Sequence, residues 1–160
     1  MMGSLSGSGP LTLDSQGYLG NYSFAGADTF TGSTVLTNGA MLTLDYSATG
    51  QNNAKLDPGS NLYLSPGLVV LAGATGSFAE SVASTYLTGG GSSIRKSGAG
   101  TETLSLGALF RDAFSTYYQG ADSLALTTTP NDASGILGCW AAVNAGWAGT
   151  NGLGAIVAVN

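Results

Sequence analysis

Leu42-Thr43-Leu44 is an apolar-x-apolar triplet, and the pattern returns at Leu62-Tyr63-Leu64, Leu104-Ser105-Leu106 and Leu124-Ala125-Leu126. The spacing fits a repeat of about 20 to 21 residues, with two repeats between Leu62 and Leu104. One step back from Leu42 lies Tyr22-Ser23-Phe24, and one step on from Leu62 lies the stretch from Val82 to Leu87. A constant period of this size is typical of stacked repeats.

Each triplet predicts a short strand with two side chains facing inward and one facing outward. A regular return of such strands indicates the coils of a solenoid. We therefore predict an all-β parallel β-helix (β-solenoid) with about seven coils of roughly 20 residues. With roughly 4.8 Å between stacked strands, the domain would be a rod about 35 Å long.

Turn signals separate the strand-like segments so often that long helices have no room. These signals are Asn38-Gly39, Asp57-Pro58-Gly59, Ser65-Pro66-Gly67, Gly89-Gly90-Gly91 and Pro130-Asn131-Asp132. The stretch from Leu109 to Gln119 has helix-like spacing of its aromatic residues, but aromatic residues and Thr116 favour strands. We expect no helix there.

Strand-like alternation covers much of the chain. The expected strands are Leu11 to Leu13, Tyr18 to Phe24, Thr34 to Leu36, Met41 to Tyr46, Leu62 to Leu64, Leu68 to Leu71, Ser92 to Arg95, Thr103 to Leu106, Ser123 to Thr127, Ile136 to Val143 and Ala155 to Val159.

The composition suits one domain rather than two, because 160 residues with 43% hydrophobic residues can bury one long core. Residues 1–10 predict a flexible Gly/Ser-rich leader, and residues 11–160 a single β-solenoid domain. A charged fraction of 8% and 26 glycines are typical of all-β secreted repeat proteins. The net charge of -5 argues against nucleic acid as a partner.

No run approaches the roughly 20 apolar residues of a membrane helix, so membrane insertion is not expected. Residues 1–10 also lack the basic region and apolar core of a signal peptide.

The sequence contains no histidine, which removes Ser-His and Cys-His nucleophiles and the commonest transition-metal ligand. A pair of carboxylates could still cleave a polysaccharide, and the candidates are Asp14, Asp28, Asp45 and Asp57. Each of them lies at a strand end or beside a turn, where aspartate accepts local hydrogen bonds. We therefore expect no catalytic residue and no enzyme activity.

No cofactor or metal site is expected either. The nearest candidate for calcium is Asn131-Asp132 with Ser134, which lacks the Gly-Gly-x-Gly-x-Asp pattern of calcium-binding β-rolls. A plain turn is the simpler interpretation.

Cys139 is the single cysteine, so a disulfide framework is excluded and a buried free thiol is expected. Tyr117, Tyr118 and Trp147 are candidate ligand-stacking aromatics, because aromatic rows on a solenoid can stack on sugars, although such residues more often fill the core. A set of threonines is expected in outward-facing ladders: Thr29, Thr31, Thr43 and Thr103.

Residues 26–35 read Gly-Ala-Asp-Thr-Phe-Thr-Gly-Ser-Thr-Val, and residues 41–46 read Met-Leu-Thr-Leu-Asp-Tyr after the turn at Asn38-Gly39. This order resembles the autotransporter-associated β-strand repeat, which has a Gly-x-Asn-Thr-(Tyr/Phe)-Thr-Gly box, a short strand, a Gly turn and a Leu-Thr-Leu strand. Asp28 stands where that family usually has Asn. Three later segments are similar to the part of those proteins that comes after the box: the Leu-rich segment at 62–71, the segment ending in Arg111, and residues 135–144.

The resemblance implies a right-handed parallel β-helix that is exported and held outside the cell, as a passenger or surface stalk of Gram-negative-type bacteria. It would be extracellular or on the bacterial cell surface.

Natural solenoids close their ends with a cap, because a bare coil leaves backbone groups unpaired and apolar side chains exposed. The sequence from Ala155 to Asn160 is an apolar strand without charge or proline, and no cap is visible at either end. We hypothesise that the ends pair with copies of the chain or with further coils of a longer chain. The candidate assembly edge is Leu153, Ile156, Val157 and Val159.

The sequence favours an extracellular structural or adhesive β-solenoid module, which would be a surface stalk, a passenger segment or a self-assembling fibre subunit. Its partners would be copies of itself or surface glycans. The alternative is a carbohydrate-binding or carbohydrate-cleaving β-helix, such as a polysaccharide lyase or a phage tailspike. An exposed aromatic platform would favour binding, and two nearby carboxylates in a groove would favour cleavage.

Overall fold

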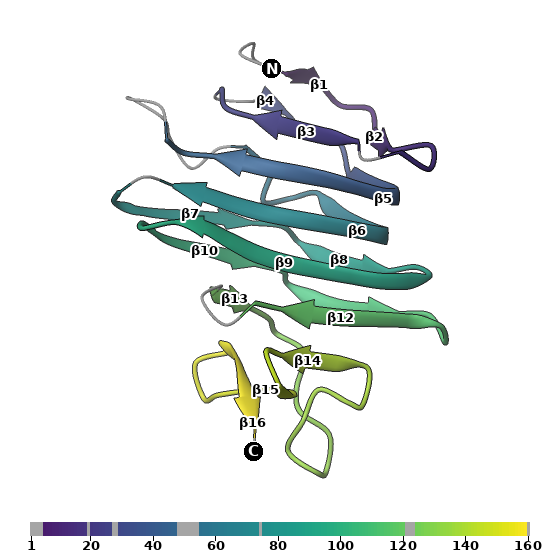
Figure 1. The fold of residues 1–160 in the computed structure, drawn as a ribbon, viewed down its shortest axis with the longest axis vertical. Helices are drawn as coiled ribbons and strands as arrows, with labels where there is room; N and C mark the ends of the chain where they lie inside the picture. Colours follow the sequence, from purple (N-terminus) through teal and green to yellow (C-terminus); the bar gives the residue numbers. More distant parts are fainter. Residues whose placement is uncertain are drawn as a thin grey trace.

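The computed structural model describes residues 5–18, 20–26, 29–47, 55–73, 75–120 and 124–159. Over these residues the chain is all-β, without a helix, and forms a parallel β-solenoid of about 5 turns (Figure 1). Its strands are β1 (Ser6–Gly7), β2 (Leu11–Asp14), β3 (Asn21–Phe24), β4 (Thr29–Phe30), β5 (Thr34–Asp45), β6 (Asn61–Gly73), β7 (Ser77–Ser81), β8 (Ser84–Leu87), β9 (Gly90–Gly98), β10 (Thr101–Ser105), β11 (Ala108–Arg111), β12 (Ser115–Gln119), β13 (Leu124–Leu126), β14 (Ala141–Val143), β15 (Gly146–Thr150) and β16 (Ile156–Val159).

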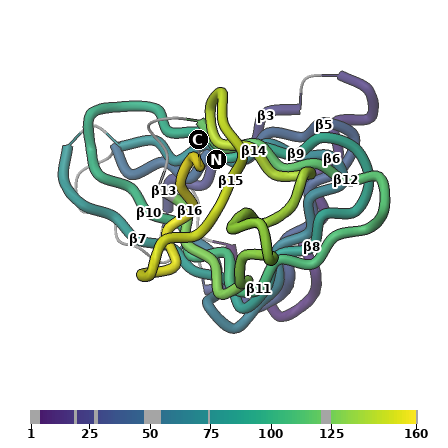
Figure 2. Tube along the Cα trace, turned by 90° about the horizontal axis from the view of Figure 1, so that it is seen from below, coloured from purple at the N-terminus to yellow at the C-terminus, as the bar shows by residue number. Residues whose placement is uncertain are grey.

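The stacked strands form three faces, and the coils superpose in a three-sided outline (Figure 2). The first face stacks β2, the start of β5, the start of β6, β8 and β11 in parallel. The second face stacks β3, the end of β5, the end of β6, β9, β12 and β14. The third face consists of β7, β10 and β13.

The predicted number of seven coils is not confirmed, because the described residues form about 5 turns and the coils measured on the first face are longer than the spacing of the triplets. On the first face, Leu13 pairs with Leu36, Leu36 with Leu64, Leu64 with Leu87, and Leu87 with Arg111. Each of these coils therefore takes up about 23 to 28 residues, against the roughly 20 expected. A coil with three strands and a turn after each strand needs more than the roughly 20 residues that separate the triplets.

The triplets stack only in part as predicted. Tyr22 to Phe24 pair in register with Leu42 to Leu44, one predicted step further along the chain, which confirms that step. Leu42 and Leu62, in contrast, lie on different faces, since Leu42 pairs with Val69 and Leu62 with Thr34. Their equal spacing is therefore not a coil repeat.

The last two triplets are neighbours on the third face, but they are shifted by one residue. Leu104 pairs with Ala125, and Ser105 pairs with Leu126. Ala125 is consequently buried while Leu126 is half-buried. A shift of one residue exchanges the two sides of a strand, so the expected inward position of Leu126 is wrong.

Alternating inward side chains build one continuous core along the axis. Its fully buried members include Leu36, Leu42, Leu44, Leu62, Leu64, Leu71, Leu87, Ile94, Leu104 and Leu106. The predicted absence of a helix between Leu109 and Gln119 is confirmed, because β11 and β12 occupy this segment. Of the strand expected from Ile136 to Val143, only Ala141–Val143 forms.

The corner between the first two faces falls inside β5, at Asn38-Gly39. Both residues have positive φ, 55° for Asn38 and 82° for Gly39, and the register shifts between Thr37 and Ala40. Asn and Gly are the residues that adopt this conformation most readily, so the predicted turn bends a strand instead of ending it.

At the N-terminal end, Met1 to Ser4 of the expected leader lie outside the described residues. Ser6–Gly7 of the same segment pair with Thr29–Phe30 in a two-stranded parallel sheet. Leu5 packs against the core. The described part of residues 1–10 thus belongs to the first coil.

At the C-terminal end, the expectation of an uncapped strand is wrong. β14 pairs with β15, and β15 with β16, in antiparallel fashion. Figures 1 and 2 show β15 and β16 lying across the end of the coil stack. Thr127 N donates a hydrogen bond to Gly154 O (2.9 Å), which ties this cap to the last coil.

Among the described residues, no helix has the length and apolarity needed to cross a membrane.

Candidate functional site

The three predicted ligand-stacking aromatics lie in different environments. Tyr117 is 2% exposed, and its hydroxyl donates a hydrogen bond to Gln119 Oε1 (3.0 Å) inside the coil. Burial raises the pKa of Tyr117 far above its usual value. Tyr117 therefore belongs to the core and cannot contact a ligand. Tyr118 is 37% exposed and Trp147 is 52% exposed.

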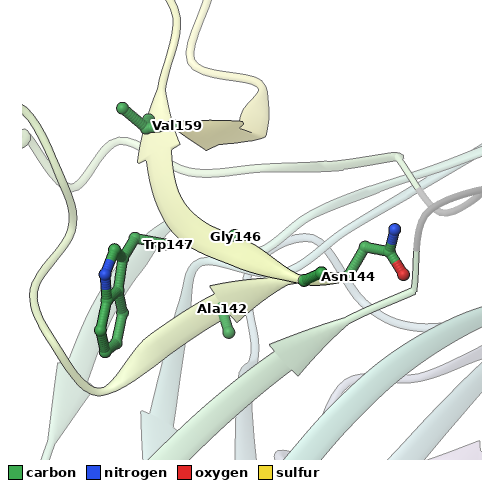
Figure 3. Close-up of a pocket in the computed structure, with 6 residues that line it drawn as sticks. Ala142, Asn144, Gly146, Trp147 and Val159 are labelled. Atoms are coloured by element: carbon green, nitrogen blue, oxygen red, sulfur yellow. The ribbon is translucent and has the colours of Figure 1, made fainter.

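Trp147 lines a surface cavity of about 440 Å³, which we call the Trp147 hollow. The hollow is lined by Ala142, Asn144, Ala145, Gly146, Trp147 and Val159. Trp147 and Asn144 lie at opposite ends of it, with Ala142 and Gly146 between them, and the Asn144 amide points away from the indole (Figure 3).

The antiparallel register of the cap builds this site. Trp147 pairs with Ala142 of β14 and with Val159 of β16, so the three side chains lie in one row on one side of the sheet. The turn between β14 and β15 places Asn144 at φ 51°, and Asn144 N donates to Gln119 O (3.0 Å). The position of Asn144 is thus fixed against β12.

Buried residues on the cap anchor the sheet that carries the indole. Ala141, Val143, Ala148 and Ile156 are 0%, 6%, 0% and 2% exposed. Gln119 Nε2 of the preceding coil donates to Ile156 O (3.1 Å). The sheet that carries Trp147 is therefore packed against the last coil and hydrogen-bonded to it.

The four residues of the candidate assembly edge differ in exposure, because the cap buries some of them. Leu153 is 89% exposed and Val157 is 36% exposed, whereas Ile156 is 2% exposed and Val159 is half-buried in the Trp147 hollow. Ile156 therefore contributes to the core of the cap rather than to an exposed edge.

An aromatic column on the first face was not anticipated from the sequence. Tyr63 stacks on Tyr86 (ring centroids 4.8 Å apart), and Tyr86 stacks on Phe110 (5.0 Å). The rings are separated by one coil each, so a search for aromatic residues at the true coil length would have found them. The stacked ring faces join neighbouring coils, and Phe110 at the end of the column is 48% exposed.

Charged side chains inside the coil form a second feature that sequence reasoning missed. Glu80 is 5% exposed and accepts hydrogen bonds from the backbone N–H groups of Lys55 (2.9 Å) and Leu56 (3.1 Å). Burial raises the pKa of Glu80 above its usual value, against the effect of these hydrogen bonds. Lys55 is 0% exposed; its Nζ donates to Gly26 O (3.1 Å) and lies 4.9 Å from the ring centroid of Tyr46.

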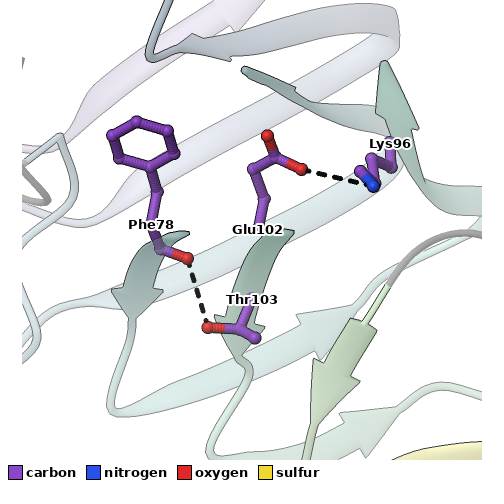
Figure 4. A network of polar contacts seen from close by, with 4 residues as sticks. All are labelled: Phe78, Lys96, Glu102 and Thr103. Atoms are coloured by element: carbon purple, nitrogen blue, oxygen red, sulfur yellow. Dashed lines mark hydrogen bonds and ion pairs between the residues drawn. The ribbon is translucent and has the colours of Figure 1, made fainter. Parts of the chain in front are cut away.

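Glu102 lies in the next coil and is 1% exposed. Lys96 Nζ lies 3.8 Å from Glu102 Oε2, while neither carboxylate oxygen accepts a hydrogen bond from a described residue (Figure 4). Thr103 points away from this pair and its hydroxyl donates to Phe78 O (3.4 Å). A buried carboxylate beside a lysine favours a structural ion pair over a cation site, because the ammonium group would repel a metal ion.

The aspartates considered for acid–base chemistry are engaged in turns. Asp14 Oδ1 accepts hydrogen bonds from Asn38 Nδ2 and Gln16 N (2.8 Å each), and Asp45 Oδ1 accepts from Ser47 Oγ (2.6 Å) and Ser47 N (2.9 Å). These bonds hold the pKa of both aspartates below the usual range. Asp28 lies outside the described residues.

Two further aspartates also lie in turns. The backbone carbonyl of Asp57, rather than its carboxylate, accepts a hydrogen bond from Ser60 N (3.0 Å). Asp132, the candidate for calcium, accepts from Ser134 Oγ (2.6 Å) and Ser134 N (2.8 Å), and these bonds lower its pKa. Each interaction is a local turn interaction that aspartate commonly makes.

Cys139 is exposed, so the expectation of a buried thiol is wrong. It precedes Trp140 in the irregular segment before β14. The surrounding apolar run suggested burial, but the chain there turns over the end of the coil instead of continuing a strand.

Of the threonines expected in outward ladders, Thr29 and Thr31 are exposed, and Thr43 and Thr103 are half-buried. Thr43 pairs with Ser23 and Val70 in adjacent coils.

Comparison with protein-family models, curated proteins and solved structures found no match to this chain.

Proposed function

We propose that this chain is a structural or adhesive β-solenoid module that works outside a bacterial cell, as a stalk, a passenger segment or a fibre subunit. The observation that carries the proposal is the unbroken parallel pairing of successive coils over a core of fully buried leucines. Such a stack resists bending and presents side chains at regular intervals.

The acidic residues support a role without catalysis. Carbohydrate cleavage requires two carboxylates that can reach a substrate. Glu80 and Glu102 are 5% and 1% exposed within the coil. Asp14, Asp45 and Asp132 are held by turn hydrogen bonds that keep them ionised. None of these residues offers the protonated, accessible acid that such a mechanism needs.

The extracellular location is supported by the resemblance of residues 26–46 to the autotransporter-associated β-strand repeat. The low charged fraction of 8% and the Gly-rich, Ser/Thr-rich composition are also typical of secreted repeat proteins.

The two ends differ as assembly surfaces. At the N-terminal end, an apolar cavity of about 150 Å³ is lined by residues including Leu5, Leu11, Leu13 and Phe24. At the C-terminal end, the antiparallel cap covers the coil. If the module joins copies of itself or further coils, the N-terminal coil is the better-suited contact.

Electron microscopy of the purified chain at several concentrations tests the structural role, together with a cleavage assay on a panel of polysaccharides. We expect short rods or end-to-end assemblies, and no new reducing ends or unsaturated sugars in the assay. Globular particles without an axial repeat, or turnover of any polysaccharide, would contradict the proposal.

A further inference from the structure

We propose that the Trp147 hollow binds a neutral oligosaccharide, with one sugar ring stacked on the indole and a further sugar unit hydrogen-bonded to Asn144 at the other end of the hollow. This inference deepens the adhesive role proposed above and rests on it, because it names the site and the class of ligand.

The exposed indole is the first feature that points to a ligand. An indole that is 52% exposed leaves much of its apolar surface in water, although its strand is firmly anchored through buried Ala148 and Ile156. Trp140, by comparison, is half-buried and has the Arg111 guanidinium 5.6 Å from its ring. In the aromatic column on the first face, Tyr86 is stacked between Tyr63 and Phe110; Phe110 at the end of the column is 48% exposed but lines no described cavity.

The shape of the site is the second feature. Phe114 and Tyr18 are more exposed than Trp147, at 86% and 85%, but neither lines a described cavity. Trp147 instead forms a wall of a cavity of about 440 Å³, which lies in the range of roughly 300–1,000 Å³ of small-molecule sites. Ala142 carries only a methyl group and Gly146 has no side chain, so the space beside the indole stays open.

The chemistry of the lining is the third feature. None of the six lining residues is charged, and apart from the indole the one polar side chain among them is the amide of Asn144. An amide can donate and accept hydrogen bonds together, which matches neighbouring sugar hydroxyls. The chain carries a net charge of -5, which disfavours an acidic polysaccharide. A neutral saccharide has apolar ring faces, which can stack on the indole, and hydroxyl groups around the ring, which can hydrogen-bond to the amide.

A second copy of the chain is the competing occupant. Val157 and Val159 lie in β16 beside Trp147, and an apolar patch of this kind can also form a dimer contact. The recessed shape and the Asn144 amide favour a small polar ligand over a flat protein surface.

Intrinsic fluorescence suits the test, because the chain has two tryptophans and Trp147 is the more exposed one. The probes are neutral oligosaccharides of glucose, mannose, xylose and N-acetylglucosamine, titrated into the millimolar range. Polygalacturonate serves as an acidic comparison. We expect saturable fluorescence changes with at least one neutral probe, and calorimetry should give the same affinity.

The variants assign the binding to the site. Trp147→Ala should weaken binding by at least about tenfold, which is measured by calorimetry because the reporter is lost. Asn144→Gly removes the amide but tolerates the positive φ, and should weaken binding severalfold. Phe114→Ala is the matched control, because it removes an exposed aromatic ring outside the hollow and should leave binding unchanged.

Circular dichroism and sedimentation complete the design. Unchanged melting of Trp147→Ala would show that lost binding is not lost folding.

Absence of saturable binding to every neutral probe, equal binding by Trp147→Ala, or binding of polygalacturonate alone would each overturn the inference. Dimerisation that Trp147→Ala abolishes, without any saccharide response, would assign the hollow to a second copy. If electron microscopy shows the rod while the titrations fail, only the saccharide site is lost.

Discussion

Glu80 is a buried residue whose ionisation couples to folding. Burial raises its pKa in the folded state above the usual 4.5. A group with a raised folded-state pKa contributes stability that is fully present below the unfolded pKa and is lost as the pH rises through the folded pKa. The fold should therefore lose stability as the pH rises from about 4.5.

Glu80→Gln tests this coupling. The variant should abolish the fall in unfolding free energy above about pH 4.5, although it loses one of the two backbone hydrogen bonds and is less stable overall. Urea denaturation between about pH 3 and pH 8 measures both effects. An identical slope in the wild type and the variant would show that Glu80 has no raised pKa.

The aspartates act in the opposite direction. Hydrogen bonds lower the pKa of Asp14, Asp45, Asp112 and Asp132 below the usual 3.8. Stability from these groups is present above about pH 3.8 and is lost as the pH falls through their folded pKa values. Wild type and Glu80→Gln should therefore share the loss of stability at the acidic end of the same titration.

The Lys96–Glu102 pair gives a second residue-scale prediction. Lys96→Met leaves a carboxylate that is 1% exposed without its partner, and should cost about 3 kcal/mol. The double variant Lys96→Met with Glu102→Gln removes the uncompensated charge and should recover part of this loss. A double-mutant cycle by urea denaturation measures the coupling. Additive effects would mean that the two charges do not interact.

At the scale of a strand, glycines at the corners of the coil decide whether neighbouring strands can pair. Gly39 has φ 82°, but an added Cβ would meet nothing closer than Ser15 Oγ at 3.8 Å. Gly98 has φ 111°, and its Cβ would lie 1.8 Å from Gly73 O of the preceding coil. At Gly39 a side chain would be disfavoured only by the positive φ. At Gly98 it would also clash with the backbone of the preceding coil.

Gly39→Ala should cost about 1–2 kcal/mol, the conformational penalty alone. Gly98→Ala should cost clearly more, because β9 must move away from β6. Denaturant midpoints of the two purified variants give the comparison. Equal losses, or a larger loss for Gly39→Ala, would contradict the close approach at Gly98.

Strands with regular alternation are the elements that the sequence predicts best. Alternation and turn chemistry depend on neighbouring residues, so they predicted β2, the two halves of β5 and the bend at Asn38-Gly39. The sequence did not predict β7, β8, β11 and β12 as separate strands. It placed the segment of β8 one repeat step after Leu62, and it predicted that the segment of β11 and β12 is not a helix. The antiparallel strand β15 gave no pattern, because Gly146 and Gly149 interrupt its alternation.

For the whole molecule, the stack predicts a gradient of local stability. Each coil contacts only its neighbours, so central coils are supported on two sides and terminal coils on one. β6 pairs with β5, β8 and β9, whereas β3 pairs only with β5 among the described strands.

Hydrogen exchange measured by mass spectrometry should therefore be slowest in β5, β6 and β9, and faster in β2, β3 and β16. Val157→Ala on the exposed side of the cap is a control that should leave the central coils unchanged. Uniform exchange along the chain would mean that the solenoid unfolds as one unit, without a gradient.

The candidate site was predictable only in part. Trp147 was named as a ligand-stacking residue, and the structure places it exposed beside a cavity. Asn144 was not named, because its place opposite the indole depends on the antiparallel turn of the cap. Tyr117 looked equivalent to Trp147 in the sequence, yet it faces inward, since a side chain's direction follows from the register of its strand.

The sequence by itself determined the all-β class, the inward leucines and the corners, because alternation, branching and turn conformations are local properties of neighbouring residues. Only the tertiary structure decided the length of a coil, which triplets stack, the burial of Glu80 and Glu102, and the cap that creates the Trp147 hollow. These features depend on how strands distant in sequence pair. The length of the turns between faces sets that pairing, and this length varies from coil to coil, so the constant spacing of the triplets does not give it.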